Sequence, residues 1–253
     1  MRTIAKDNYW FSKIGRPIIG LAPMHQTTTS TFRLKCRKVG ADVVYSEMVA
    51  AEAIIRRVPQ AFEMMKFKEA ERPILIQIFG VNPKSMAQAA KIIEKEFRPD
   101  GIDINFGCPV QKAAKQGFGA IQLADPEAAA KIVRAVARAT NLPVSVKMRL
   151  PSKNVADTLK FVEKIAAAGV KVVAIHGRTP TQKFRGQADW AHAYAVKKKF
   201  PDLIVLGNGD ISSKQNLKSK VQNLDGVLVG RAAKREPAIF RELVQAKKQR
   251  PAT

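Results

Sequence analysis

Eight short apolar, β-rich segments recur along the chain, and amphipathic segments with helical spacing separate them. Apolar strands that alternate with helices are typical of parallel strands buried on both faces, because helical crossovers cover the sheet. Eight such units in 253 residues predict an α/β fold, a (β/α)8 TIM barrel whose usual size is ~250 residues. The alternative is a doubly wound open sheet. No G-x-G-x-x-G follows the first strand, which disfavours a dinucleotide-binding fold.

The expected strands lie at residues 17–24, 42–47, 73–80, 101–107, 143–150, 170–178, 203–210 and 226–233. The expected helices include residues 31–40, 83–97, 126–140, 154–169, 212–223 and 237–248. No Pro/Gly/Ser-rich linker or compositional break divides the chain, so we expect one domain over residues 1–253. The last expected helix leaves no room for a second, C-terminal domain.

Positive charge dominates the composition, with 44 Lys and Arg against 21 Asp and Glu, a net +23. A field of this size attracts polyanions, which makes RNA or DNA the first candidate partner and an anionic lipid surface the second. Adaptation for solubility is the other explanation. The sequence shows no signal peptide and no apolar run of the ~20 residues that a membrane helix needs. Two cysteines make no disulfide framework, so we expect a cytoplasmic protein without a membrane partner.

Uncommon residues, many of them polar, gather where the expected strands end, which in a TIM barrel is where chemistry occurs. They are Pro23, Met24, His25, Glu47, Met48, Gln77, Asn105, Cys108, Lys147, Arg149, His176, Arg178, Asn208, Gly209, Asp210, Gly230 and Arg231. Polar groups at the ends of all eight strands are hard to explain as packing.

The segments "LGNGD" and "VGRAA", after the seventh and eighth strands, have the composition of a phosphate grip. Glycines such as Gly209 and Gly230 let backbone N–H groups approach a phosphate, and Arg231 adds charge. The loops after these two strands hold phosphate in many TIM barrels. Ordinary tight turns are the alternative.

Lys147 lies inside the strand "VSVKM", where alternation directs it into the barrel, and a buried lysine is rarely core filler. It could hold an anionic ring or form a Schiff base. His176 ends the next strand, so we expect it to face a ligand too. The three histidines lie far apart in the sequence, and no His/Cys/carboxylate spacing predicts a metal site.

Cys108 lies in the segment "GCP", directly after the expected fourth strand. Thiols are mostly protonated at neutral pH, so this one can donate a proton as well as attack as a nucleophile. No histidine is adjacent in sequence to activate it. Cys36, by contrast, fits a small buried hydrophobic residue in the helical "TFRLKCRKVG".

Taken in order, these segments resemble the tRNA-dihydrouridine synthase family of FMN-dependent TIM barrels. The matching motifs are "LAPM…TFR", "YSEMVAAEA", "IQIFG", "DINFGCPVQKAAKQGFGA", "VSVKMRL", "HGRTPTQKFRGQADW", "GNGDI" and "DGVLVGRAAKREPAIF". The resemblance covers residues 17–240. "INFGCPV" and "HGRT" followed by "ADW" are its most specific parts, whereas "GNGDI" also occurs in other flavin barrels.

The resemblance implies that NADPH reduces FMN and that the flavin reduces a uridine in RNA, most directly tRNA. Cys108 would donate the proton to C5, giving 5,6-dihydrouridine, and the target base would be turned out of its stack. Implied FMN contacts are Pro23, Met24, His25, Gln77, Lys147, His176, Asn208, Gly209, Asp210, Gly230 and Arg231. Implied substrate contacts are Asn105, Arg178 and Arg185.

The chain departs from the family's pattern in two ways. The family commonly reads Gly-(Val/Ile)-Thr-Asp after "APM", where this chain has "HQTTTS", so hydroxyls replace an acid. Family members also commonly carry a C-terminal helical domain that grips tRNA, which we expect to be missing here. Basic runs would then take over part of the grip: residues 197–199, the "AKREP" loop, the terminal "KKQR", Arg56 and Arg57.

Two other functions remain open. A flavin barrel acting on a free pyrimidine or another small molecule explains Cys108 and the phosphate loops but not the net charge. A basic RNA-binding protein without catalysis explains the charge but not the presence of Cys108, Lys147 and His176. The sequence does not specify the uridine position, the oligomeric state or the choice between tRNA and ribosomal RNA.

Overall fold

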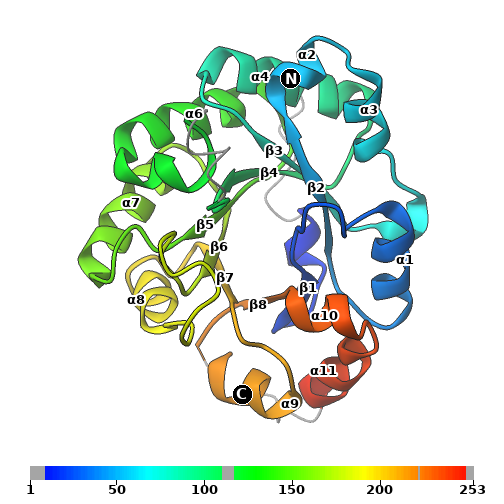
Figure 1. The fold of residues 1–253 in the computed structure, drawn as a ribbon, viewed down its shortest axis with the longest axis vertical. Coiled ribbons are helices and arrows are strands. Elements are labelled where there is room, and N and C mark those ends of the chain that lie inside the picture. Colours follow the sequence, from blue (N-terminus) through cyan, green and yellow to red (C-terminus); the bar gives the residue numbers. More distant parts are fainter. Residues whose placement is uncertain (1–8, 110–116, 222, 249–253) are drawn as a thin grey trace.

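The computed structural model describes residues 9–109, 117–221 and 223–248, and within them the chain forms a (β/α)8 TIM barrel (Figure 1). The strands are β1 (Ile18–Leu21), β2 (Val44–Ala50), β3 (Ile74–Phe79), β4 (Gly101–Phe106), β5 (Val144–Arg149), β6 (Val172–His176), β7 (Ile204–Asn208) and β8 (Gly226–Val229). The α-helices are α1 (Ser30–Lys38), α2 (Ala51–Ile55), α3 (Pro59–Met65), α4 (Pro83–Glu96), α6 (Pro126–Ala139), α7 (Val155–Ala167), α8 (Ala191–Lys199), α9 (Lys214–Lys220), α10 (Arg231–Arg235) and α11 (Ile239–Lys248). Short 3₁₀ turns are η2 (Trp10–Ser12), η3 (Glu69–Glu71) and η4 (Gly119–Ala124).

The eight strands run parallel in the order β1-β8-β7-β6-β5-β4-β3-β2, and the two ends of this sheet meet. An isolated parallel bridge joins Gly20 to Val43, with Leu21 N–H donating to Val43 O at 2.9 Å. This seam closes the sheet into a barrel, and the helices surround it in Figure 1. The open-sheet alternative is therefore wrong, and the barrel prediction is confirmed.

The predicted strands are confirmed with shifted ends. The second strand continues to Ala50, three residues beyond its predicted end at Glu47. The eighth stops at Val229, because α10 begins at Arg231. The predicted strand 226–233 included the first residues of α10, because the apolar Ala232 and Ala233 follow the turn directly. Helices α2, α3, α8 and α10 were not predicted: α2 and α10 span only five residues each, too few to show a helical period.

Apolar side chains form two separate cores. The larger lies between the outer face of the strands and the helices, with residues such as Ile76, Ile104 and Phe161. The smaller fills the barrel interior with Ile18, Ala22, Val43, Tyr45, Leu75, Val172, Ala174, Leu206 and Leu228, together with Trp10 from η2. Within the described ranges, no helix has both the length and the apolar character needed to cross a membrane.

Gly226 permits the close approach of β8 to β1. A Cβ atom on Gly226 would lie 2.1 Å from the backbone oxygen of Ile18, far inside van der Waals contact, and 2.7 Å from its backbone nitrogen. Because both neighbours are backbone atoms of the paired strand, no side-chain rotation relieves the clash. The seam between β1 and β8 therefore requires glycine at this position.

We predict that Gly226→Ala lowers the free energy of unfolding by about 2–3 kcal/mol, because the two strands must move apart. In a thermal melt followed by circular dichroism, this corresponds to a Tm about 4–10 °C lower. Gly15→Ala is the matched control, since a Cβ there meets no atom within 4 Å. A Gly226→Ala protein that melts with the control would contradict the steric account.

Candidate active site

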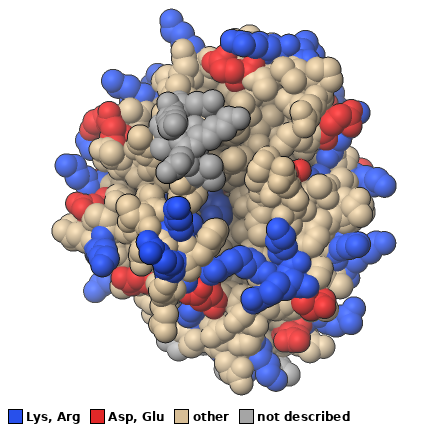
Figure 2. Space-filling model, in the orientation of Figure 1, with Lys and Arg blue, Asp and Glu red and all other residues tan. Residues whose placement is uncertain are grey.

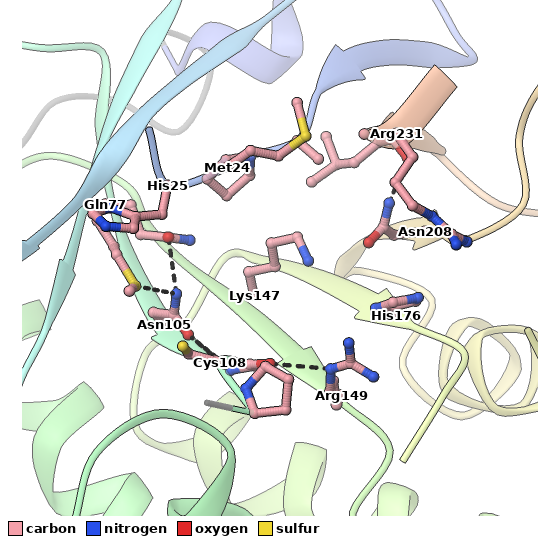
Figure 3. A pocket seen from close by; sticks show the side chains of 18 of the residues that line it. Met24, His25, Gln77, Asn105, Cys108, Lys147, Arg149, His176, Asn208 and Arg231 are labelled. Carbon is pink, nitrogen blue, oxygen red and sulfur yellow. Dashed lines mark hydrogen bonds between the residues drawn. The ribbon is translucent and has the colours of Figure 1, made fainter. Parts of the chain in front are cut away.

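A cavity of about 280 Å³ opens at the carboxyl ends of the strands. Figure 2 shows it as a central hollow, and Figure 3 shows side chains from several strands converging on it. Its lining is Ala22, Pro23, Met24, His25, Met48, Gln77, Asn105, Gly107, Cys108, Pro109, Lys147, Arg149, His176, Phe184, Asn208, Gly209, Ile211, Leu228, Gly230 and Arg231. The cavity thus occupies the end of the barrel where the sequence placed the chemistry.

Most residues predicted for the site come together in this cavity. Those that line it are Pro23, Met24, His25, Gln77, Asn105, Cys108, Lys147, His176, Asn208, Gly209, Gly230 and Arg231. Asp210, Arg178 and Arg185 do not line it. Arg185 is exposed, and Arg178 is only 2% exposed.

Cys108 is a free, half-buried cysteine on the loop after β4. Its backbone N–H donates to Asn105 Oδ1 at 3.0 Å, and its carbonyl accepts from Ala120 N–H at 3.0 Å. Gly119, at φ +75°, packs directly on it, since an added Cβ would lie 2.8 Å from the Cys108 oxygen. The glycine of "FGA" therefore supports the thiol loop.

Among the residues that the structure describes, Lys147, Arg149 and Arg231 line the cavity and no carboxylate does. Burial, and then the neighbouring Arg149, lower the pKa of Lys147 to about 8. Burial and the charges of Arg178 and Arg231 lower the pKa of Arg149 to about 10. These shifts record positive charge that the lining itself leaves uncompensated, so the cavity suits an anionic ligand.

His176 is neutral in this environment. Burial first, and then the four surrounding cations Lys147, Arg149, Arg178 and Arg231, lower its pKa to about 2. Its Nε2 lies 3.3 Å from Arg178 Nη1. Arginine can only donate, so Nε2 accepts and the ring proton is assigned to Nδ1.

Asp210 faces protein cations beside the cavity. Its two carboxylate oxygens accept from Arg178 Nη2 at 2.8 Å each, and Arg231 Nη2 donates to Oδ1 at 3.0 Å. Burial opposes the charge, but hydrogen bonds from the Ala188 N–H and Arg178 hold the pKa of Asp210 below its usual value. Asp210 therefore orients Arg231, and a direct ligand contact by Asp210 or Arg178 stays a prediction.

Among the lining residues that were not predicted as ligands, Arg149 and Phe184 make specific contacts at the site. Arg149 donates to Gly107 O at 3.1 Å and to Thr179 O at 3.1 Å, so it ties the Cys108 loop to the loop after β6. Phe184, on that second loop, is 57% exposed, with the Arg231 guanidinium 4.9 Å from its ring centroid. Arg149 had a sequence signal, its place at a strand end, whereas Phe184 had none.

The departure at "HQTTTS" has a structural counterpart. The Thr28 hydroxyl accepts from Met24 N–H at 3.2 Å and donates to Met24 O at 3.0 Å, which closes this loop on itself. A carboxylate reaches the loop from elsewhere, because Glu47 on β2 accepts from the Gln26 N–H. Glu47 Oε1 also lies 3.8 Å from His25 Nδ1.

Comparison with known proteins decides the family. A sequence model described as dihydrouridine synthase matches residues 20–253. The chain is 40% identical over 228 residues to a probable tRNA-dihydrouridine synthase of Aquifex aeolicus, covering 88% of this chain and 71% of that protein. A probable tRNA-dihydrouridine synthase of Mycobacterium tuberculosis is 36% identical over 247 residues, covering 92% and 63%.

The chain belongs to the dihydrouridine synthase family. A third relative, tRNA-dihydrouridine synthase B of Pseudomonas aeruginosa, is 34% identical over 229 residues, which cover 88% of this chain and 68% of that protein. The chain thus spans 63 to 71% of the length of these three relatives.

The cavity fits the family's flavin, judged by the residues that line it. An FMN brings a phosphate, and a reduced flavin ring can carry negative charge; the lining offers Lys147, Arg149 and Arg231 without a competing carboxylate. Apolar side chains such as Met24 and Leu228 provide surface for a ring system. Among the described residues, no group of three or more His, Cys, Asp or Glu could hold a metal ion.

Some predicted positions lie outside the described residues. They are residues 110–116 ("VQKAAKQ"), residue 222 of the expected helix 212–223, and residues 249–250 of the terminal "KKQR". The described basic runs separate in space. Lys234 and Arg235 belong to α10, which follows β8 at the cavity end, whereas Lys197–Lys199 end α8 at the opposite end of the barrel. Lys197 and Lys199 bind Asp225 and Glu163 there.

We predict that Lys147→Met stabilises the ligand-free protein at neutral pH, because it removes a buried charge that Asp103 only partly compensates. The native pKa of about 8 lies below the ordinary 10.5, so below pH 8 folding buries a charged lysine and carries the full cost. We expect a Tm gain of about 2–5 °C at pH 7 that shrinks as the pH rises from 8 to 10.5.

The matched control is Lys160→Met, on the exposed face of α7. It should change the Tm by less than about 1 °C at any of these pH values. A pH-independent gain for Lys147→Met would mean that apolar packing, and not the charge, is responsible.

Proposed function

We propose that this chain reduces a uridine in RNA, most directly in tRNA, to 5,6-dihydrouridine, with FMN as cofactor and NADPH as reductant. The observation that carries the proposal is a half-buried thiol, Cys108, on the wall of a cavity lined by uncompensated cations. The family relatives named for action on tRNA support the choice of substrate. The corresponding location is the cytoplasm.

FMN would supply hydride to C6 of the uracil ring. The residues of this chain would hold and orient the reactants. Lys147, which projects into the cavity from β5 in Figure 3, is suited to stabilise negative charge on a flavin ring. Gln77 would hydrogen-bond the ring edge, and Asn208, Gly209 and Gly230, with Arg231, would hold the ribityl and phosphate groups. Pro23, Met24, His25 and His176 would complete the flavin's surroundings.

Cys108 would donate the proton that C5 of the base needs once hydride has reached C6. Addition across the double bond needs the two hydrogens from separate sources, and the thiol is the acid that the loop after β4 presents to the cavity. Arg149, anchored on Gly107 O beside Cys108, keeps this loop at the cavity wall. Asn105, Arg178 and Arg185 remain proposed contacts to the RNA.

A target base has to leave its stack to enter the cavity, and charge on the surrounding surface would hold the RNA meanwhile. Exposed basic residues on the loops and helix that follow β6 and β8 are Lys183, Arg185, Arg231, Lys234 and Arg235. Figure 2 shows Lys and Arg side chains gathered along the lower rim of the hollow. This arrangement favours a polyanion over a free pyrimidine, which needs no such rim.

We predict that Cys108→Ala retains the yellow flavin spectrum and loses at least about 100-fold in the rate of dihydrouridine formation, because the proton donor is absent. The measurement is mass spectrometry of unmodified tRNA after incubation with NADPH and holoenzyme. Cys36→Ala, at a fully buried cysteine of α1, is the control and should keep its turnover. Full turnover in Cys108→Ala would contradict the assignment, and a colourless protein would contradict flavin chemistry altogether.

We also predict that tRNA affinity falls steeply between 50 and 200 mM salt, as for a protein that contacts several phosphates. The double variant Lys234→Ala/Arg235→Ala should bind about 3- to 10-fold more weakly at low salt and show a shallower salt slope. Lys198→Ala, at the far end of the barrel, is the control. An equal loss of tRNA affinity in Lys198→Ala and in the double variant would indicate non-specific attraction. Activity on free uridine equal to that on tRNA would favour the small-molecule alternative.

A further inference from the structure

Asp103 is a fully buried carboxylate on β4, two residues before Asn105, which lines the cavity. Its Oδ1 accepts from Ser145 Oγ at 2.5 Å, and its Oδ2 accepts from Gln77 Nε2 at 2.6 Å. The three residues are register partners on β4, β5 and β3. None of the described ion pairs includes Asp103, so these two hydrogen bonds, together with the more distant charge of Lys147, compensate its charge.

A continuous chain of hydrogen bonds joins Asp103 to the Cys108 loop. Gln77 donates to Asp103 and its Oε1 accepts from Asn105 Nδ2 at 2.9 Å. Asn105 Oδ1 then accepts from Gly107 N–H at 2.9 Å and Cys108 N–H at 3.0 Å. Figure 3 shows the upper links, with Asn105 between Gln77 and the cysteine.

The groups at the two ends of this hydrogen-bonded chain fix which way the amides of Gln77 and Asn105 are turned. A carboxylate only accepts, so Gln77 must turn its NH₂ group toward Asp103 and its oxygen toward Asn105. Backbone N–H groups only donate, so Asn105 must turn its oxygen toward Gly107 and Cys108. Amide side chains can otherwise flip. The acceptor oxygen of Asp103 therefore keeps the Gln77 and Asn105 amides in the orientation that the Cys108 loop requires.

We propose that Asp103 is a positioning residue for dihydrouridine formation, which holds Cys108 in place through the amides of Gln77 and Asn105. The inference rests on the proposed function and deepens it. Asp103 touches neither base nor flavin in this account. Its contribution is an acceptor oxygen in a layer that other proteins of this fold fill with apolar side chains.

The chain also determines what Gln77 offers the cavity. Its oxygen is used by Asn105, and one amide hydrogen is used by Asp103. The remaining amide hydrogen leaves Gln77 as a donor, so it pairs with an acceptor on the ligand. Asn105 makes protein contacts with both its oxygen and its nitrogen, which fixes it as the support of the loop.

The groups around Asp103 favour an acceptor without requiring its charge. Burial raises the pKa of Asp103 to about 6, against the hydrogen bonds of Gln77 and Ser145 and the charge of Lys147. Tyr45, on β2, is also buried, and burial together with the charge of Asp103 raises the pKa of its hydroxyl. Since Ser145 can accept as well as donate, an amide in place of the carboxylate can bond Ser145 through its NH₂ and still accept from Gln77.

Three variants separate the acceptor from the charge and from packing. Asp103→Leu removes the acceptor and keeps the same number of side-chain heavy atoms and the branch at Cγ, although the two methyl groups are larger than the oxygens. Asp103→Asn keeps an acceptor for Gln77 and removes the charge. Ser145→Ala perturbs the same layer but leaves the chain to Cys108 untouched. Fully buried Cys36 reports folding, because iodoacetamide reaches it only in unfolded protein. If Asp103→Leu fails this check, Asp103→Ala replaces it.

Two readouts are taken on holoenzyme. In the first, flavin reduction by NADPH and subsequent tRNA reduction are timed separately. Asp103→Leu should slow tRNA reduction about 100-fold, as for a displaced catalytic group, and change flavin reduction less than about threefold. Asp103→Asn and Ser145→Ala should stay within about threefold of wild type in both steps.

In the second readout, iodoacetamide alkylates Cys108 without RNA. Asp103→Leu should raise the rate at least about fivefold, because the released loop opens, and the other two variants should not. Wild-type behaviour of Asp103→Leu, or equal impairment of Asp103→Asn or Ser145→Ala, would overturn the proposal. If wild-type enzyme forms no dihydrouridine, the proposed function fails, and the alkylation rates still decide the role of Asp103.

Discussion

Hydrogen bonding across the seam between β1 and its neighbours β8 and β2 is the constraint on which the site depends. β1 pairs with β8 over four residues and reaches β2 through the bridge from Gly20 to Val43. The absence of a side chain at Gly226 lets the backbones approach. Closure brings the carboxyl ends of strands far apart in sequence to one cavity, so that Met24 from the beginning of the chain faces Arg231 near its end.

Positive charge gathers in this cavity at a cost to the protein. Lys147 and Arg149 have lowered pKa values because no lining carboxylate offsets their burial, and His176 is kept neutral by the same cations. Nearby, Asp210 pairs with Arg178 and Arg231 beside the cavity. A site built this way gives up folding stability and is suited to bind an anionic ligand.

The hydrophobic pattern predicted the fold and most of the cavity lining. Because the strands are continuous apolar runs, their carboxyl ends could be located in the sequence, and alternation alone placed Lys147 inside the barrel. The resemblance then added roles for the same positions. The sequence therefore predicted the features that depend on where strands end or on the alternation of side chains along a strand.

Features that depend on contacts between elements could not be predicted. Phe184 lies in an irregular loop, without periodicity to indicate that it reaches the cavity. Arg178 and Asp210 sit at strand ends as expected, but their mutual pairing turns them away from it. The role of Asp103 depends on the register of three strands, since Gln77 and Ser145 must stand opposite it. The position of the Lys197–Lys199 run was equally hidden in the sequence, because a helix that precedes a strand ends at the side of the barrel opposite the cavity.

The central claim is that one cavity holds a reduced flavin and a base taken from RNA, with Cys108 completing the reduction. The most direct measurement is an anaerobic single turnover, in which prereduced holoenzyme is mixed with unmodified tRNA or with free uridine, and flavin absorbance and dihydrouridine are both quantified. The account predicts that tRNA reoxidises the flavin with one dihydrouridine formed per flavin, while free uridine leaves it reduced. Reoxidation without dihydrouridine, or at the same rate with free uridine, would contradict it.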